Sequence, residues 1–386
     1  MATTHQVIFY PVGNGDTTQI VLSAGRRVLF DFCHRGKAED PDTPEIDLKS
    51  RLKEDLKKAS RDYFDVVAFT HGDLDHIQGS TEFFELLHAK KYQGDGRIKI
   101  RELWVPAAMV VEEADNDHQG DENTLLRQEA RHRLLEGKGI RVFSKPQALA
   151  DWLEPCLKDR GEAASARDHL FVDAGTIVPG FSLTTDGVEF FCHSPFIKHC
   201  DGGDIIRNRA SLIFNVRLRA DGADYDYLEI GDATWAELED MVAITKYHKN
   251  DGRLAWDLFN IPHHCSYLAL NEDGQKGDKE TVPKPLVKEL LLKGKKDSYI
   301  VSCSKPMPDV KDSYAQVQPP HIQARNAYER HLKEVGGRKF LVTMEEPNAN
   351  KPEPITFEIT VGGVSWKRSG SIGAPAIILS SPPRAG

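Results

Sequence analysis

The stretch Thr70-His71-Gly72-Asp73-Leu74-Asp75-His76 decides the fold of this chain. Two imidazoles and two carboxylates fall within six consecutive residues, directly after the apolar run 66–69. This order predicts a buried strand whose end carries the cluster, followed by a helix. Open α/β sheets bind their ligands at the carboxyl ends of strands, so the stretch predicts both a fold class and the place of a site.

The residue types in this loop favour metal binding. Neutral imidazole and carboxylate are ligands of divalent first-row cations. A single His or Asp here is more typical of a solvated acidic turn. Four of them in one loop, directly after a buried strand, indicate a metal site.

The same pattern recurs farther along the chain, where three more apolar segments end in metal-capable side chains. The predicted strand 188–192 delivers His193, the strand 225–230 ends in Gly231-Asp232, and the strand 256–261 ends in Pro262-His263-His264. One histidine at a strand end is more often structural than a ligand. Four such ends in one chain predict a shared site along one edge of a layered sandwich.

Composition limits the function classes. The chain has 386 residues, 40% hydrophobic and 28% charged, enough for one large α/β domain or two smaller ones. Its net charge of -9 argues against non-specific coating of nucleic acid but permits a local basic groove. The six cysteines form no CxxC pair, so neither a zinc ribbon nor a disulfide framework is indicated. With no secretory signal and no long apolar run, we expect a cytoplasmic protein that does not enter a membrane.

The domain organisation is expected to be simple. Residues 1–365 are predicted to form one domain, and the tail 366–386, rich in Ser, Pro, Gly and Ala, is predicted to be mobile. Over residues 112–170 the sequence becomes highly charged and its pattern predicts helices, which we interpret as a helical insertion or lid. A surface-exposed helical elaboration without a role in the site fits this segment equally well.

The motif order carries a family resemblance. His71-x-Asp73-x-Asp75-His76, then a strand-end His, then Gly-Asp, then His-His-x-Ser resembles the metallo-β-lactamase superfamily. The resemblance implies a four-layer αβ/βα sandwich with two metal ions on one edge. Asp73 stands where the family usually has a second histidine.

Further phrases narrow the resemblance. The segments Val12-Gly13-Asn14-Gly15-Asp16 and Asn208-Arg209-Ala210-Ser211-Leu212 are similar to the hydrolase domain of the competence DNA-uptake protein ComEC and its soluble relatives. In the His263-His264-Cys265-Ser266 phrase, Cys265 stands where that group usually has glycine.

The resemblance implies a set of site residues. Metal one would be held by His71, Asp73 and His193, metal two by Asp75, His76 and His264, and Asp232 would bridge them. His263 would face away or support a ligand. Because the set is richer in carboxylate than a thiolate zinc site, we expect two Zn²⁺ or Mn²⁺ ions. Asp75 and Asp232 would be catalytic, since two ions that share a water lower its pKa and make hydroxide available.

Other residues are weaker candidates. Asn208, Ser211 and His321 could contact substrate, although structural roles are more typical of such positions. Asp16 could orient a ligand or simply cap its turn. Basic residues within 127–141 and 288–296 fit either a phosphate-guiding surface or solvated helix faces.

The leading functional hypothesis is a two-metal phosphodiesterase or nuclease whose substrate is nucleic acid or a nucleotide. Two alternatives remain: a hydrolase of another ester, thioester or lactam, and a non-catalytic component of a multi-protein system. The first would show activity on generic ester or lactam substrates. The second would show no bound metal and no effect of ligand substitutions.

Overall fold

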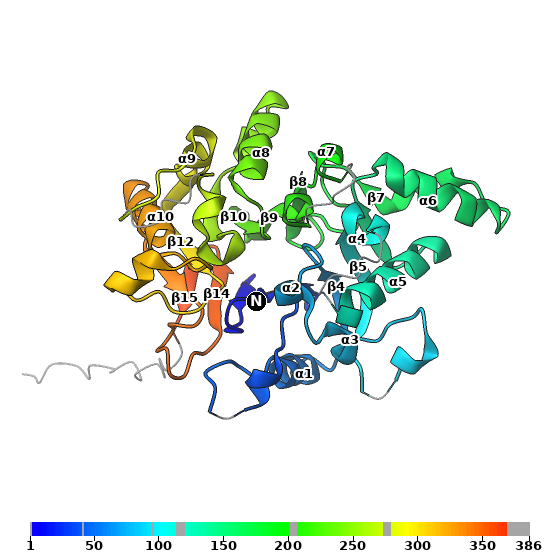
Figure 1. Cartoon of the computed structure of the whole chain (residues 1–386), viewed down its shortest axis with the longest axis horizontal. Coiled ribbons are helices and arrows are strands. Elements are labelled where there is room, and N and C mark those ends of the chain that lie inside the picture. The colour runs from blue at the N-terminus through cyan, green and yellow to red at the C-terminus, as the bar shows by residue number, and fades with distance from the viewer. Residues whose placement is uncertain are drawn as a thin grey trace, which may run out of the picture.

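The chain folds into two β-sheets that pack face to face, with helices on both outer faces (Figure 1). The computed structural model describes residues 2–40, 42–94, 96–112, 120–200, 207–272 and 279–368. This mixed α/β architecture confirms the fold class expected from the sequence. No helix among the described residues is long and apolar enough to cross a bilayer.

The first sheet has the order β15-β14-β1-β2-β3-β4-β5-β6-β7. It is antiparallel from β15 to β3 and parallel from β3 to β7. Its strands are β1 (His5–Phe9), β2 (Thr18–Val21), β3 (Arg27–Phe30), β4 (Tyr63–Ala68), β5 (Lys99–Pro106), β6 (Ile140–Phe143), β7 (Phe171–Val172), β14 (Ile355–Thr360) and β15 (Gly363–Lys367).

The second sheet has the order β13-β12-β11-β10-β9-β8. Strands β8, β9 and β10 are antiparallel, and β10 to β13 are parallel. Its strands are β8 (Val188–Ser194), β9 (Ile213–Ala220), β10 (Ala223–Ile230), β11 (Trp256–Asn260), β12 (Gly294–Ser302) and β13 (Lys339–Val342). Because β3, β4, β10 and β11 all end at one edge of the sandwich, the residues after them can meet there.

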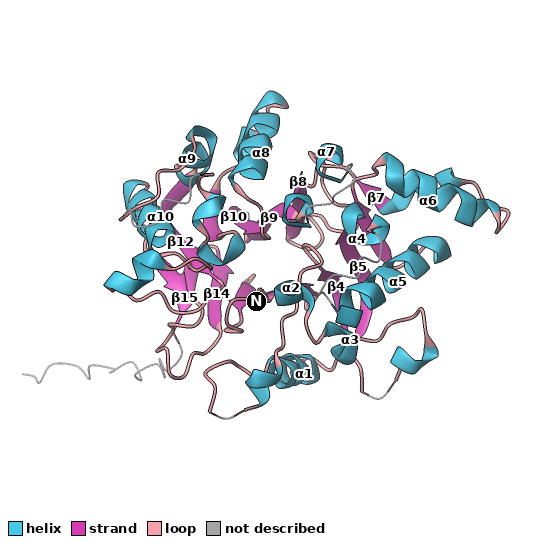
Figure 2. Ribbon diagram, in the orientation of Figure 1, coloured by secondary structure: helices cyan, strands magenta, loops and turns pink. Residues whose placement is uncertain are grey.

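The helices form two separate groups, at the left and right of Figure 2. Helices α8 (Trp235–Tyr247), α9 (Pro285–Leu291) and α10 (Ile322–Glu334) cover the second sheet. The first sheet is covered by α1 (Leu48–Lys58), α4 (Ala107–Val111), α5 (Gly120–Glu136) and α6 (Gln147–Lys158). Short helices α2 (Leu74–Ile77), α3 (Ser80–Phe83) and α7 (Ile197–Cys200) complete the set.

Aromatic side chains fill the space between the sheets. The Trp104 ring lies edge-on to Phe190 at 5.2 Å between centroids, and Phe143 lies edge-on to Phe214 at the same separation. Both sheets contribute to this core, because alternate residues of a strand face opposite sides. Separate apolar layers lie under the two helix groups, so the molecule has four layers: helix, sheet, sheet, helix.

The segment expected as a helical insertion is part of the sandwich. Strand β6 within it pairs in parallel with β5, and β7 extends the same sheet. Helices α5 and α6 bury apolar residues against that sheet rather than standing apart from it. Residues 113–119 of this segment lie outside the described residues.

The end of the domain also differs from the expectation. Strand β15 runs to Lys367, so the sheet continues past residue 365. Of the expected mobile tail, residues 369–386 lie outside the described residues.

Candidate metal centre

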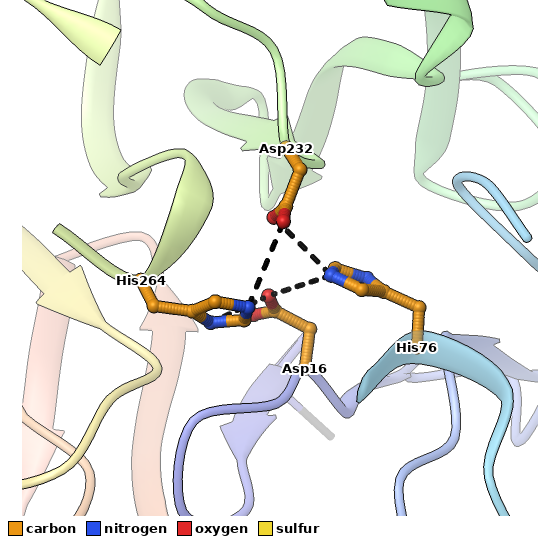
Figure 3. Close-up of side chains that lie close together, drawn as sticks. All are labelled: Asp16, His76, Asp232 and His264. Atoms are coloured by element: carbon orange, nitrogen blue, oxygen red, sulfur yellow. Dashed lines mark ion pairs between the residues drawn. The ribbon is translucent and has the colours of Figure 1, made fainter. Parts of the chain in front are cut away.

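Four buried side chains converge at the shared edge of the two sheets. Asp16 precedes β2, His76 lies in α2 after β4, Asp232 follows β10, and His264 follows β11. One ligand atom from each lies within 4.8 Å of the others, and Figure 3 shows the side chains pointing into one common space. We call this set the compact group.

Two glycines allow the backbone segments to approach this closely. A Cβ on Gly231 would lie 2.8 Å from the Thr70 side chain, so β10 can end against the metal loop only without one. A Cβ on Gly15 would lie 2.9 Å from the Asp75 carbonyl oxygen, which accepts a hydrogen bond from the Asp16 N–H at 3.1 Å. Replacing either glycine by a residue with a side chain would therefore displace the segment that carries Asp232 or Asp16.

The histidines of the compact group turn their Nε2 atoms toward its carboxylates. His76 donates its Nδ1–H to Asp31 at 2.7 Å, which leaves Nε2 at 3.2 Å from Asp232 Oδ1 and 3.7 Å from Asp16 Oδ2. His264 donates its Nδ1–H to the Cys303 carbonyl at 2.9 Å, and its Nε2 lies 3.7 Å from Asp232 Oδ2. Such backing fixes the tautomer that a metal-binding imidazole needs.

The donor atoms fit a divalent cation. Four buried donor atoms have no hydrogen-bond partner among the described residues: Asp16 Oδ1, His76 Nε2, Asp232 Oδ1 and His71 Nε2. A buried polar atom without a partner costs about 1–3 kcal/mol. Since imidazole nitrogens and carboxylate oxygens are common zinc and manganese ligands, a cation would satisfy these atoms together.

The charges of the compact group are strongly coupled. Burial alone would raise the pKa of Asp232, but His76 and His264 hold it well below its usual value. Burial alone would lower the pKa of His264, but Asp232 and Asp75 raise it to about 9. A cation would replace the protons that these carboxylates attract, so its binding would release protons.

The other residues of the opening motif border the compact group. Asp75 Oδ2 lies 3.0 Å from His264 Nε2. His71 Nε2 lies 3.6 Å from Asp73 Oδ2 and 3.9 Å from Asp232 Oδ2. His263 is more exposed, and its Nε2 lies 3.9 Å from Asp232 Oδ2. The motif therefore places Asp75 on the His264 side of Asp232, and His71 and Asp73 together on the other side.

Asp31, which the sequence reasoning did not single out, supports the site. It follows β3 with a left-handed φ of 54° and is buried. Its carboxylate accepts hydrogen bonds from the N–H and the hydroxyl of Thr70, both at 2.7 Å, and from His76. The available signal was its place after a buried strand, the same pattern that indicated the histidines.

His193 does not join the cluster, contrary to its assignment to metal one. Its Nδ1 lies 3.1 Å from Thr245 Oγ1 and its Nε2 lies 3.0 Å from the Arg253 carbonyl oxygen. The alternation of β8 explains this, because Phe190 and Cys192 face the core between the sheets and His193 faces the helical layer. Burial lowers the pKa of His193 to about 4, which suits a neutral structural histidine.

His193→Ala is therefore expected to leave metal content unchanged while lowering the free energy of unfolding by about 2–4 kcal/mol, the cost of a small cavity and two unpaired polar groups. The same substitution at His264 is expected to remove the metal. Elemental analysis and chemical denaturation measure the two effects. A folded His193→Ala protein without metal would make His193 a ligand after all.

The proposed substrate residues lie around the site in different ways. Ser211 Oγ is buried without a hydrogen-bond partner and packs near Gly231. His321 accepts from the Tyr267 N–H at 3.3 Å and donates to the Val317 carbonyl at 3.2 Å, so it links the loop after β11 to the segment before α10. Asn208 is half-buried in the 3₁₀ helix Arg207–Ala210.

The loop that carries His264 has an unusual backbone. His263, His264 and Cys265 have consecutive positive φ values of 52°, 51° and 65°. The left-handed region favours glycine, the residue expected at position 265 from the resemblance. Cys265 is completely buried, so packing of its side chain accompanies the strained turn.

Helix α5 contacts the metal loop, by which we mean residues 70–79. The Glu122 carboxylate accepts from the Gly79 N–H at 2.8 Å, and the Asn123 amide packs against Gly72. The basic residues of this helix serve the fold: Arg131 donates to the Val110 carbonyl, and Arg133 pairs with buried Glu129 at 2.6 Å.

Comparison with known proteins finds only distant likenesses to solved structures. No family model and no curated protein matches the chain. Similar solved structures include a diphosphatase from the PhnP family, with 12% identity, a TM-score of 0.31, and coverage of 93% of this chain and 98% of that one. A long-form RNase Z from yeast has 12% identity, a TM-score of 0.41, and coverage of 88% and 40%. The metallo-β-lactamase GOB-18 from Elizabethkingia meningoseptica has 10% identity, a TM-score of 0.31, and coverage of 85% and 88%.

These neighbours are metallo-β-lactamase superfamily members, and they do not show the specific likeness to ComEC. At such low identity and TM-score the likeness carries no argument about substrate. The chemistry must be argued from the residues of the site.

Proposed function

We propose that this chain is a metal-dependent hydrolase of phosphodiester bonds in nucleic acid or nucleotides. The observation that carries the proposal is the compact group, in which buried donor atoms of Asp16, His76 and Asp232 converge without hydrogen-bond partners among the described residues. Asp16, His76, Asp232 and His264 would hold Zn²⁺ or Mn²⁺. A divalent ion held there supplies a Lewis acid and lowers the pKa of a coordinated water.

The exposure of the side chains indicates the direction of substrate approach. Asp16 and Asp232 are buried, whereas Asp75 is 32% and Asp73 is 26% exposed. A substrate would therefore meet the side formed by Asp73 and Asp75. Asp75, which contacts His264 and remains accessible, is placed to accept a proton from the attacking water.

The donor chemistry favours a phosphodiester over a lactam. The carboxylates Asp16, Asp73, Asp75 and Asp232 make the site rich in oxygen, which suits the harder ions used with phosphate oxygens. Asp73 in place of an imidazole moves the balance further in this direction. The expected partner is thus an anionic substrate that carries phosphate oxygens.

The test is hydrolysis of single- and double-stranded DNA, RNA, cyclic nucleotides and a chromogenic phosphodiester, each with Mn²⁺, with Zn²⁺ and with chelator. We expect metal-dependent cleavage of at least one of these, and a loss of about a hundredfold or more in His76→Ala. His248→Ala, an exposed histidine at the end of α8, is the matched control and should retain activity.

Generic ester and lactam substrates complete the experiment. Cleavage of these without any phosphodiester would replace the proposed substrate class while keeping the hydrolase. Full phosphodiesterase activity in chelator would remove the metal from the mechanism.

A further inference from the structure

The two halves of the implied two-metal site are unequal. The compact group forms a closed half with donors from both sheets. On the other side of Asp232, His71 and Asp73 are the donors that the described residues bring together, because the third expected ligand, His193, is turned toward Thr245 and Arg253. The residues present thus fit one ion well and a second ion poorly.

A guanidinium lies on the incomplete side. Arg207 Nη1 is 3.5 Å from Asp73 Oδ1, and Arg207 Nη2 forms an ion pair with Glu112. An arginine side chain is a permanent cation at any physiological pH. A fixed positive charge therefore stands beside the carboxylate expected to bind metal one.

The position of Arg207 is reinforced from α5. Glu112 Oε2 accepts from Asn123 Nδ2 at 3.1 Å, and the Glu112 carbonyl accepts from Arg127 Nη1 at 2.9 Å. Asn123 in turn packs against Gly72 of the metal loop. Because this network fixes Glu112, it also restricts the position of the Arg207 guanidinium.

A dication on this side would have to displace the guanidinium from Asp73 or remain beside it. Either route costs free energy, because like charges a few ångströms apart repel strongly when partly removed from water. The compact group has no such competitor among the described residues that contact it.

We propose that Arg207 takes the place of metal one, so that the chain binds a single ion tightly at the compact group. The proposal rests on the metal-dependent function proposed above and refines its ion count. The guanidinium supplies the positive charge on the Asp73 side that a second ion would otherwise supply. It can donate to an anionic oxygen there, as guanidinium groups do at phosphate sites.

The experiment measures metal content and affinity rather than turnover. The full chain is stripped with chelator, reloaded with Mn²⁺ or Zn²⁺, desalted and analysed for ions per chain, and a second binding step is followed by calorimetry. We expect a single retained ion in the wild type and in His71→Ala, and none in Asp16→Ala. Arg207→Ala is expected to strengthen binding of a second ion about tenfold, because the competing charge is gone.

Two substitutions serve as matched controls. Arg207→Lys keeps the charge and should leave the second binding step as weak as in the wild type. Arg209→Ala removes an arginine from the same 3₁₀ helix, 54% exposed and paired with Glu237, and should change nothing.

Each remaining outcome has a definite meaning. Two tightly held ions in the wild type, or no change in the second step with Arg207→Ala, would overturn the inference and leave the proposed function standing. A wild-type chain that binds no ion even in excess metal would overturn both.

Discussion

Asp232→Asn is expected to abolish tight metal binding and to reduce phosphodiester hydrolysis at least about a thousandfold, equivalent to about 4 kcal/mol in the activation barrier. Asp232 is the common neighbour of the imidazoles. Its carboxylate lies 3.2 Å from His76, 3.7 Å from His264 and 3.9 Å from His71. Asparagine keeps the shape but removes the charge that draws these donors and a cation together.

Metal content and initial rates measure this effect, and circular dichroism confirms that the variant is folded. Asp224→Asn is the matched control, because Asp224 lies on the same strand, β10, and forms an ion pair with Arg219 away from the site. An Asp232→Asn protein with wild-type metal content would show that Asp232 does not hold the ion.

Asp31→Asn is expected to weaken metal binding by about 10–100-fold, the usual effect of removing the group that orients a ligand. Asp31 accepts from the Thr70 N–H, the Thr70 hydroxyl and the His76 Nδ1–H. An amide offers one acceptor oxygen and turns an NH₂ group toward one of these donors. We also expect the free energy of unfolding to fall by about 1–3 kcal/mol, because a buried donor loses its partner.

The backbone does not confound this comparison, since asparagine tolerates the left-handed φ of 54° as aspartate does. Asp221→Asn is a close control: Asp221 is also left-handed, with φ 47°, but it is exposed and accepts only from Thr3. Calorimetric metal titration and denaturation of both variants separate the effects. Equal metal affinity in Asp31→Asn and wild type would mean that Thr70 alone orients the imidazole.

Much of the candidate site is readable from sequence because it follows strand ends. His76, Asp232 and His264 were each expected after an apolar segment, and the structure brings all of them into the compact group. Asp16 was weighed evenly between a turn cap and a ligand-orienting role. The long-range contact with His264 that places it in the site could not be read from its own turn.

The remaining differences have local physical causes. At His193, the pattern showed a strand end but not which face of the sheet the side chain takes. Asp31 was missed because one acidic residue after a strand carries no motif. Arg207 acts on Asp73 from more than a hundred residues away, a contact that only the fold creates.

In the fold too, some elements can be predicted from the local sequence and others depend on contacts with distant strands. Leu48, Leu52 and Leu56 recur at spacings of four residues, a pattern that predicts a helix, and they form the buried face of α1. Strands β6 and β7 have four and two residues, which is too short for a clear alternation. The charged sequence around them therefore suggested an insertion. Pairing of β6 with β5 and of β7 with β6, rather than local preference, makes them strands.

The compact group draws its donors from both sheets: Asp16 and His76 adjoin the first, and Asp232 and His264 adjoin the second. An ion bound there would therefore act as a cross-link between the two halves of the sandwich, joining segments far apart in the chain. At a hundredfold excess over its dissociation constant it would add about 2.7 kcal/mol to the apparent stability. Loss of the ion and separation of the two sheets on unfolding would then be coupled. The concentration of free cation would therefore affect the stability of the protein as well as its rate of hydrolysis.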